Sequence, residues 1–321
     1  MPTPDVSAEL KTRIAWLYHV EGMTQDEIAR ELGLNRARVL RILANARQDG
    51  TVQIRVTTKL SHCVALAQAL QKRWNLKQAI VIPEPQDEAH INAIVGAELG
   101  AYLSQNVEAD MTIGLGWGMT LSAGLAAIEP RAESGIRVVS LLGGLTKVSS
   151  VNPSEFAWRV ADKLSAECFL MAAPVFAPSA EVREALMNHS GIEEILRRTK
   201  HLDMAIISVG DLTPHSIFRE YGLLSREEIV SLEAAGAIGD ILCRFVDAEG
   251  EVVDHPVNDR VLAVHPRDLR DTRQIVLASG GWQKLAAIRA ALKGLRPTVL
   301  ITNERVAERL ADEPGPAPTE V

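Results

Sequence analysis

The sequence predicts an α/β protein in two parts: a small all-α domain at residues 1–58 and a larger, mainly parallel α/β domain at residues 59–311. Three observations support this prediction. The chain of 321 residues is longer than one average domain. Its first part carries apolar residues at helical spacing, and the rest alternates short apolar runs with helical segments. The Pro-rich, apolar-poor end at residues 312–321 predicts a flexible tail.

Charge is distributed unevenly along the chain. Hydrophobic residues make up 47% and charged residues 23%, a composition that excludes wholesale disorder. The formal net charge is -7, yet the segment from Gly33 to Lys59 holds six basic residues and one acid, Asp49. The sequence therefore predicts a small basic face on an otherwise acidic protein.

Several classes of protein are excluded by simple sequence features. No apolar run approaches the roughly 20 residues that cross a bilayer, and the N-terminus lacks the pattern of a signal peptide. The three cysteines, Cys63, Cys168 and Cys243, form no CxxC pair. We therefore expect a cytoplasmic protein with no membrane partner, no cofactor and no metal site.

The first part of the chain predicts three short helices. Thr24 has the position of an N-cap, and Glu27 three residues later completes a capping box for a helix over residues 25–32. Gly33 ends this helix, and Asn35 is the N-cap expected for the third one. Three apolar residues of the third helix are expected to turn inward: Val39, Leu40 and Leu43.

Two short helices joined at a glycine, with arginines opening the second, are what major-groove recognition requires. We predict that Asn35, Arg36 and Arg38 contact bases or lie close to them, and that Arg41 and Arg47 neutralise phosphates. The full predicted DNA-contacting set is Thr24, Gln25, Asn35, Arg36, Arg38, Arg41 and Arg47. The alternative is a helical protein-interaction module whose arginines are simply solvated.

After residue 58 the pattern changes to alternating strands and helices. The expected strands are residues 79–82, 112–115, 138–142, 168–172, 204–209, 241–245, 274–278 and 298–302. The expected helices are residues 90–105, 121–128, 153–165, 180–187, 226–234, 283–292 and 304–310. Continuous apolar strands separated by helices predict a mainly parallel, Rossmann-like sheet that is covered on both faces.

An amphipathic helix is expected over residues 60–74, between the two parts of the chain. A single helix-turn-helix reads only a few base pairs, so tight operator binding calls for paired copies of the chain. The apolar residues of this helix are candidates for part of the self-association surface: Val64, Leu66, Ala67 and Leu70.

Three glycine-rich turns follow predicted strands, at residues 114–120, 143–152 and 280–284. Glycines let the backbone approach a ligand, and N–H groups at a following helix suit an anion, although each turn taken alone is also explained by tight turning. Sheets of this class bind ligands at the carboxyl ends of their strands, so we expect the turns to converge. Their predicted effector-binding residues are Gly116, Trp117, Gly118, Thr120, Gly143, Gly144, Thr146, Lys147, Asn152, Gly281 and Lys284.

A further segment, residues 236–247, adds two charged candidates. Asp240 follows a glycine turn and is suited to accept sugar hydroxyls, and Arg244 is suited to contact an anion. The alternative for Asp240 is a tight turn that its carboxylate caps. Asp203 and Asp211 flank another predicted strand and are candidates either for lining the pocket or for capping.

Over residues 10–311 the order of these motifs resembles the SorC/DeoR-type sugar-binding transcriptional regulators. The motifs are the helix-turn-helix, Gly116-Trp117-Gly118, Gly143-Gly144, Gly236-Ala-Ile-Gly-Asp240, Gly280-Gly281 with Lys284, and the closing segment 292–304. The resemblance implies a homodimer or homotetramer that binds a double-stranded DNA operator under the control of a sugar, polyol or sugar phosphate. It also implies regulation, as a repressor, of a carbohydrate or polyol catabolic operon.

The sequence departs from the family pattern at two positions. The family often has Arg after Gly-Trp-Gly, where this chain has Met119, and often has Asp where this chain has Asn303. Loss of a cation beside the glycine turn weakens the case for a phosphorylated ligand and strengthens that for a neutral sugar or polyol.

The family's effector domain is similar to sugar-phosphate isomerases and deaminases, so an enzyme is the alternative function. Its acid–base candidates are Asp211, His215 and Asp240, with Lys147 or Lys284 as helper. The histidines show no metal-ligand spacing and no Ser/His/Asp arrangement is evident, so we expect no catalytic activity.

Overall fold

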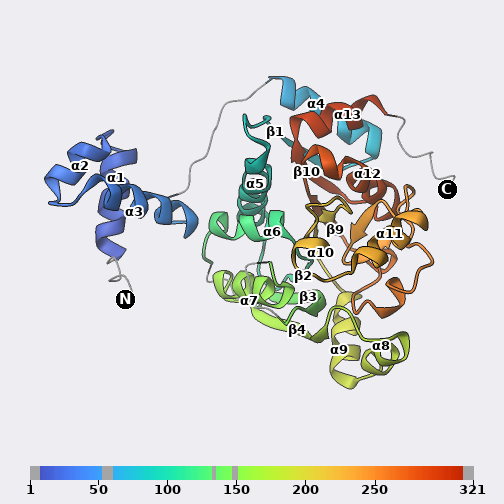
Figure 1. Cartoon of the computed structure of the whole chain (residues 1–321). Helices are drawn as coiled ribbons and strands as arrows, with labels where there is room; N and C mark the ends of the chain where they lie inside the picture. Colours follow the sequence, from blue (N-terminus) through green and yellow to red (C-terminus); the bar gives the residue numbers. More distant parts are fainter. Residues whose placement is uncertain (1–7, 53–60, 132–134, 147–150, 314–321) are drawn as a thin grey trace. The chain divides into compact units, whose positions relative to one another are not determined.

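The computed structural model of the chain describes residues 8–52, 61–131, 135–146 and 151–313. The chain divides into two compact units, residues 1–58 and residues 59–321 (Figure 1). Because the described residues end at 313, most of the predicted flexible tail, residues 312–321, lies outside them. Within the described residues, no helix is long and apolar enough to cross a membrane.

The first unit is a three-helix domain made of α1 (Ala8–His19), α2 (Gln25–Glu31) and α3 (Arg36–Gln48). The predicted capping box is present, because Thr24 accepts from the backbone N–H of Glu27 while the Glu27 carboxylate accepts from that of Thr24. Gly33 has a φ of +64°, a conformation that ends α2 and that glycine adopts without strain. The small core consists of Ile14, Ile28, Ala29, Val39, Ile42 and Leu43.

One inward-facing prediction for α3 is wrong. Val39 and Leu43 are buried as expected, whereas 52% of Leu40 is exposed. The helical repeat explains the difference. The buried positions of α3 are 39, 42, 43 and 46, which lie along one side of the helix, and residue 40 lies outside that side.

The second unit contains a seven-stranded sheet whose order is β1-β10-β9-β5-β2-β3-β4, with every neighbouring pair parallel. The strands match seven of the predicted apolar runs closely. Their bounds are β1 Gln78–Ile82, β2 Thr112–Leu115, β3 Arg137–Gly144, β4 Glu167–Pro174, β5 Met204–Ile207, β9 Gln274–Ala278 and β10 Val299–Asn303.

Helices cover both faces of this sheet, as predicted. Side chains alternate along each strand, so Met204 and Ile206 pack into one apolar cluster while Ala205 and Ile207 pack into another. Figure 1 shows α5, α6 and α7 on one side of the strands and α11 and α12 on the other. The helix bounds are α4 Ser61–Trp74, α5 Ile91–Asn106, α6 Met119–Ala123, α7 Pro153–Lys163, α8 Ala180–Met187, α9 Ser190–Thr199, α10 Ile217–Glu220, α11 Arg226–Ala234, α12 Leu285–Gly294 and α13 Glu304–Asp312.

A second, smaller sheet corrects one strand prediction. The run 241–245 does not join the parallel sheet; it is divided between β7 (Gly239–Ile241) and β8 (Arg244–Val246), which form an antiparallel hairpin. Leu242 and Cys243, at the turn, both have positive φ values, 55° and 61°. This geometry suits two-residue hairpin turns, but these residue types do not signal it. The run 204–209 is likewise divided, with β6 (Val209–Gly210) pairing with β7.

The predicted self-association role of α4 conflicts with its packing. Leu66 and Leu70 belong to the core of the second unit, where α4 packs against β1 and α13, and the Trp74 indole donates a hydrogen bond of 3.1 Å to the carbonyl of Leu310. Among the apolar residues of α4 predicted to form a self-association surface, Val64 is 46% exposed. The apolar stripe that signalled an interface therefore serves mainly to attach α4 to its own domain.

Candidate DNA-binding face and effector site

The second helix of the helix-turn-helix is held at its start by the predicted cap. The side-chain oxygen of Asn35 accepts a hydrogen bond of 2.8 Å from the backbone N–H of Arg38. Thr24 caps α2 in the same way, and the next residue, Gln25, is half-buried. Thr24 and Asn35 therefore position the two helices, whatever further contact they make with DNA.

The arginines of α3 lie on the outside of the three-helix unit. Arg36, Arg41 and Arg47 are exposed and Arg38 is half-buried. Arg36 lies 3.6 Å from the Asp26 carboxylate, but both side chains are more than 60% exposed. Exposed ion pairs contribute little, so the Arg36 guanidinium is free to exchange this partner for a base or phosphate.

The strand order of the large sheet contains a switch point, the kind of position at which related sheets bind ligands. From β2 the chain moves outward through β3 to β4, and it then returns to β5 on the other side of β2 and moves outward through β9 to β10. The chain thus reverses direction between β2 and β5. In open parallel sheets, ligands bind in the crevice outside the carboxyl ends of strands at such a switch point.

The first glycine turn lies at this switch point. The backbone N–H of Gly116, directly after β2, donates a hydrogen bond of 2.8 Å to the carbonyl of Ile206 in β5. A Cβ added at Gly116 would come within 3.1 Å of that carbonyl oxygen, and Gly118 has a φ of +125°. Gly118 therefore has a backbone conformation that favours glycine, and Gly116 leaves little room for a side chain against β5.

The residues around Gly118 differ in exposure. Trp117 is 5% exposed, and its ring lies edge-on to Phe218 with 6.0 Å between the centroids. The buried Thr120 hydroxyl donates to the side-chain oxygen of Asn92 at 2.7 Å. Met119, where the family often has Arg, is 49% exposed. Among the predicted residues of this turn, Trp117 and Thr120 thus have partners within the domain.

The second turn is closed by Asn152. Its side-chain amide donates a hydrogen bond of 2.7 Å to the carbonyl of Leu145, and its oxygen accepts from the backbone N–H of Ser154. Gly143 lies so close to β4 that an added Cβ would come within 2.5 Å of the Ala173 carbonyl oxygen. Thr146 is exposed, and Lys147 lies outside the described residues.

The third turn, after β9, is held by β10. Gly281 has a φ of +100°, and its backbone N–H donates a hydrogen bond of 2.9 Å to the side-chain oxygen of Asn303. The short helical segment Trp282–Lys284 follows the turn directly and ends in Lys284. The Trp282 side chain is 44% exposed. Strands β2, β3 and β9 lead into the three turns, and β5 ends just before Ser208. These four strands are adjacent in the order β9-β5-β2-β3, so the turns share one edge of the sheet.

A charged cluster stands beside these turns. Burial lowers the pKa of Lys284, while the nearby carboxylates of Asp211 and Asp240 act in the opposite direction. Burial also raises the pKa of Asp240 from an ordinary 3.8 to about 7, against the opposing effects of the Cys243 N–H and of Lys284. The structure thus brings together one cation and two acids from three separate segments of the sequence.

Asp240 and Arg244 also have clear structural tasks. The Asp240 carboxylate accepts a hydrogen bond of 2.7 Å from the N–H of Cys243, which is the turn-capping role that the sequence left open. The Arg244 guanidinium donates to the carbonyls of Asn258 and Ala263 at 3.4 and 3.2 Å. Burial lowers the pKa of Arg244 to about 10. Its Nε is buried and has no hydrogen-bond partner among the described residues.

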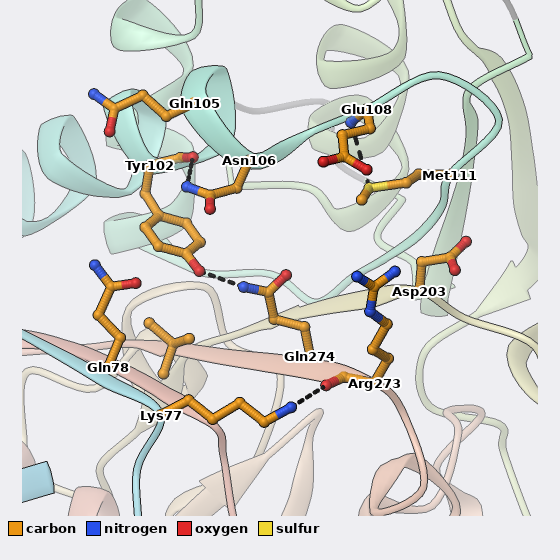
Figure 2. Close-up of a pocket in the computed structure, with 11 residues that line it drawn as sticks. Lys77, Gln78, Tyr102, Gln105, Asn106, Glu108, Met111, Asp203, Arg273 and Gln274 are labelled. Carbon is orange, nitrogen blue, oxygen red and sulfur yellow. Dashed lines mark hydrogen bonds between the residues drawn. The ribbon is translucent and has the colours of Figure 1, made fainter.

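A separate cavity of about 320 Å³ opens at the opposite, amino edge of the sheet (Figure 2). Its lining includes Tyr102, whose hydroxyl accepts a hydrogen bond from the side-chain amide of Gln274, and the basic residues Lys77 and Arg273. Asp203 lines this cavity too, away from the three glycine turns, and accepts from the backbone N–H of Thr112, so of the two roles left open for it a backbone-capping one is observed. Strand direction explains this, because Asp203 precedes β5 rather than following it.

The comparisons with known proteins agree with this architecture. A family model described as "Putative sugar-binding domain" matches residues 58–311. The chain is 30% identical to the erythritol catabolism regulatory protein EryD of Brucella abortus, covering 97% of this chain and 99% of that protein. It is also 30% identical to the deoxyribonucleoside regulator of Bacillus subtilis, over 95% of this chain and 98% of the relative.

Solved structures give the same result. The crystal structure of the full-length sorbitol operon regulator SorC from Klebsiella pneumoniae superposes with a TM-score of 0.71 at 28% identity, covering 95% of this chain and 99% of that one. These relatives and neighbours are transcriptional regulators and not enzymes, so the alternative enzymatic function has no support. The chain belongs to the SorC/DeoR-type family of transcriptional regulators with a sugar-binding domain.

Proposed function

We propose that this regulator represses a carbohydrate or polyol catabolic operon in the bacterial cytoplasm, that α3 reads the operator, and that the effector binds outside the carboxyl ends of β9, β5, β2 and β3. The observation that carries the effector site is the gathering of three glycine turns around the switch point of the sheet. The DNA-binding assignment rests on the capped α3 and its outward arginines.

We propose a neutral sugar or polyol as the effector. Lys284 has the carboxyl groups of Asp211 and Asp240 beside it, which offset part of its charge, and Met119 supplies no cation at the first turn. A phosphate would have to displace or neutralise those carboxylates, whereas hydroxyl groups can donate to them and accept from Lys284. Two relatives are named for the polyols erythritol and sorbitol, which supports this choice.

A thermal-shift screen tests the effector assignment. Purified protein would be scanned with erythritol, sorbitol and deoxyribose, and with a phosphate ester of each. A ligand that binds only the native state raises the melting midpoint by an amount set by its concentration relative to Kd. We expect a neutral compound to raise the midpoint more than its phosphate does. A larger shift with the phosphates would overturn the choice of ligand class.

We further propose that the active form is a homodimer or homotetramer, because operator half-sites related by symmetry require paired helix-turn-helix domains. Sedimentation velocity at micromolar concentration, with and without operator DNA, measures this directly. A monomer that bound its operator with nanomolar affinity would contradict the proposal.

A further inference from the structure

Leu40 is a large apolar side chain on the outer face of α3. Its exposed fraction is 52%, although Val39 beside it is fully buried and Leu43 is 5% exposed. It is absent from the cluster of apolar residues that forms the core of its unit and from those that pack against that core. The stability of the three-helix unit therefore does not account for a leucine at this position.

The neighbours of Leu40 on the helix surface are of two kinds. Residues three and four apart lie above one another on a helix, so Leu40 lies beside Ala37, Arg36 and Ala44, and next to Arg41 along the chain. Ala37, Arg36, Arg41 and Ala44 are all exposed. The outer face of α3 thus presents methyl groups between two guanidinium groups.

This combination matches the floor of the DNA major groove. Thymine carries its C5-methyl group there, and apolar side chains distinguish thymine by contact with that methyl, while arginines recognise guanine edges or phosphates. The positive charge on both sides of Leu40 favours a polyanion over a neutral apolar surface as the occupant of this face. The two alanines are small enough to let the helix approach the base edges.

We propose that Leu40 is a specificity-determining residue that recognises thymine through its C5-methyl group in the operator. The inference rests on the proposed DNA-binding function of α3 and adds the base preference to it. It predicts that at least one thymine of each half-site is required for its methyl group alone, independently of its hydrogen bonds.

Replacing thymine by uracil removes only the methyl group, which makes the test specific. An operator would first be selected from a pool of randomised duplexes with the full-length protein. Each thymine of the selected site would then be replaced singly by uracil, and affinity measured for the wild type and for Leu40→Ala. Alanine is at least as good a helix former as leucine, so this variant is expected to fold.

We expect one uracil position per half-site to weaken wild-type binding about fourfold, the equivalent of one buried methyl group. Leu40→Ala should bind the thymine operator more weakly by a similar or larger factor and should show no further loss with uracil at that position. Val20→Ala, at a site just after α1 that is 58% exposed, is the matched control and should keep the uracil effect unchanged.

Three outcomes would overturn the inference, and a fourth concerns the proposed DNA-binding function on which it rests. Uracil at every position without effect on the wild type, or an equal uracil effect in Leu40→Ala, would show that Leu40 reads no methyl group. Leu40→Ala that changes the sedimentation of the free protein but not the uracil effect would assign Leu40 to contact between copies instead. Failure to select any duplex would contradict the DNA-binding function itself.

Discussion

Asn303, at the end of β10, donates a hydrogen bond of 2.6 Å from its side-chain amide to the carboxylate of Glu84, which follows the neighbouring strand β1. The oxygen of the same amide accepts from the backbone N–H of Gly281. Asn303 thus links two strand ends to the third glycine turn. The family often has Asp here, and the pairing gives a physical reason for the difference, because an amide can donate to Glu84 and a carboxylate cannot.

Asn303→Asp is expected to destabilise the protein by about 1–3 kcal/mol at neutral pH, since it replaces a hydrogen bond with two adjacent carboxylates. Chemical denaturation at pH 8 measures the loss, which should shrink at pH 5, where one carboxyl of the pair can hold a proton. Adding Glu84→Gln should restore most of the stability, because the glutamine amide can donate to the new carboxylate. No rescue by the second substitution would mean that the Asn303–Glu84 contact is not the cause.

The arginines at the start of α3 should carry sequence preference. Arg36→Ala and Arg38→Ala are each expected to cost about 1–3 kcal/mol in operator affinity and to relax base preference, if the contact is bidentate. Arg47→Ala, in the last turn of α3, should instead weaken binding to all sequences alike and flatten its dependence on salt. Fluorescence anisotropy with operator and scrambled duplexes separates the two patterns. Unchanged operator binding by both Arg36 and Arg38 variants would show that recognition lies elsewhere.

Gly118→Val should abolish the effector response and leave operator binding intact. The nearest atom to an added Cβ is 3.9 Å away, so space is available, but the φ of +125° is one that a β-branched residue rarely adopts. The first glycine turn must then change shape. The measurement is effector-dependent release of operator DNA, with circular dichroism to establish folding. A folded Gly118→Val protein that still responds to the effector would place the effector site elsewhere.

Lys284→Ala should weaken binding of a phosphorylated ligand more than that of a neutral polyol, because it removes the cation that lies beside the carboxyl groups of Asp211 and Asp240. Ligand binding is followed by tryptophan emission, to which the 44% exposed Trp282, two residues from Lys284, should contribute. The matched control is Tyr102→Phe at the opposite edge of the sheet, which removes a cavity hydroxyl (Figure 2). Loss of effector binding in the Tyr102 variant but not in the Lys284 variant would assign the effector to that cavity.

Asp240→Asn should alter how stability depends on pH. The folded protein keeps the Asp240 proton up to a pH of about 7, because burial raises this pKa from an ordinary 3.8, whereas the unfolded chain releases the proton near the ordinary value. Between these pH values the folded state binds the additional proton, so the contribution of Asp240 to the free energy of unfolding falls as pH rises and then levels off. The Asn variant, which can still accept from Cys243, should gain stability relative to wild type from pH 4 to 7. A constant difference across this range would show that the Asp240 pKa is not raised.

Several features of this protein follow from its sequence alone because their signals are local. The cap of Thr24 with Glu27, the cap of Asn35 and the stop at Gly33 depend on residues within three positions of one another. The strands of the parallel sheet are continuous apolar runs, since both faces of that sheet are buried. Turn residues after those runs could be located in the same way, and so could the order of the family's motifs.

Tertiary structure decided what depends on distant partners. The strand order places the first glycine turn at a switch point, the antiparallel hairpin takes the run 241–245 out of the sheet, and Lys284 meets Asp211 and Asp240 only after folding. The outward position of Leu40 and the inward packing of Leu66 depend on which face of each helix the rest of the unit covers. Moving an apolar side chain out of water lowers the free energy, and this much can be read from the sequence. The sequence does not specify which surface covers that side chain, because the hydrophobic effect has no direction of its own.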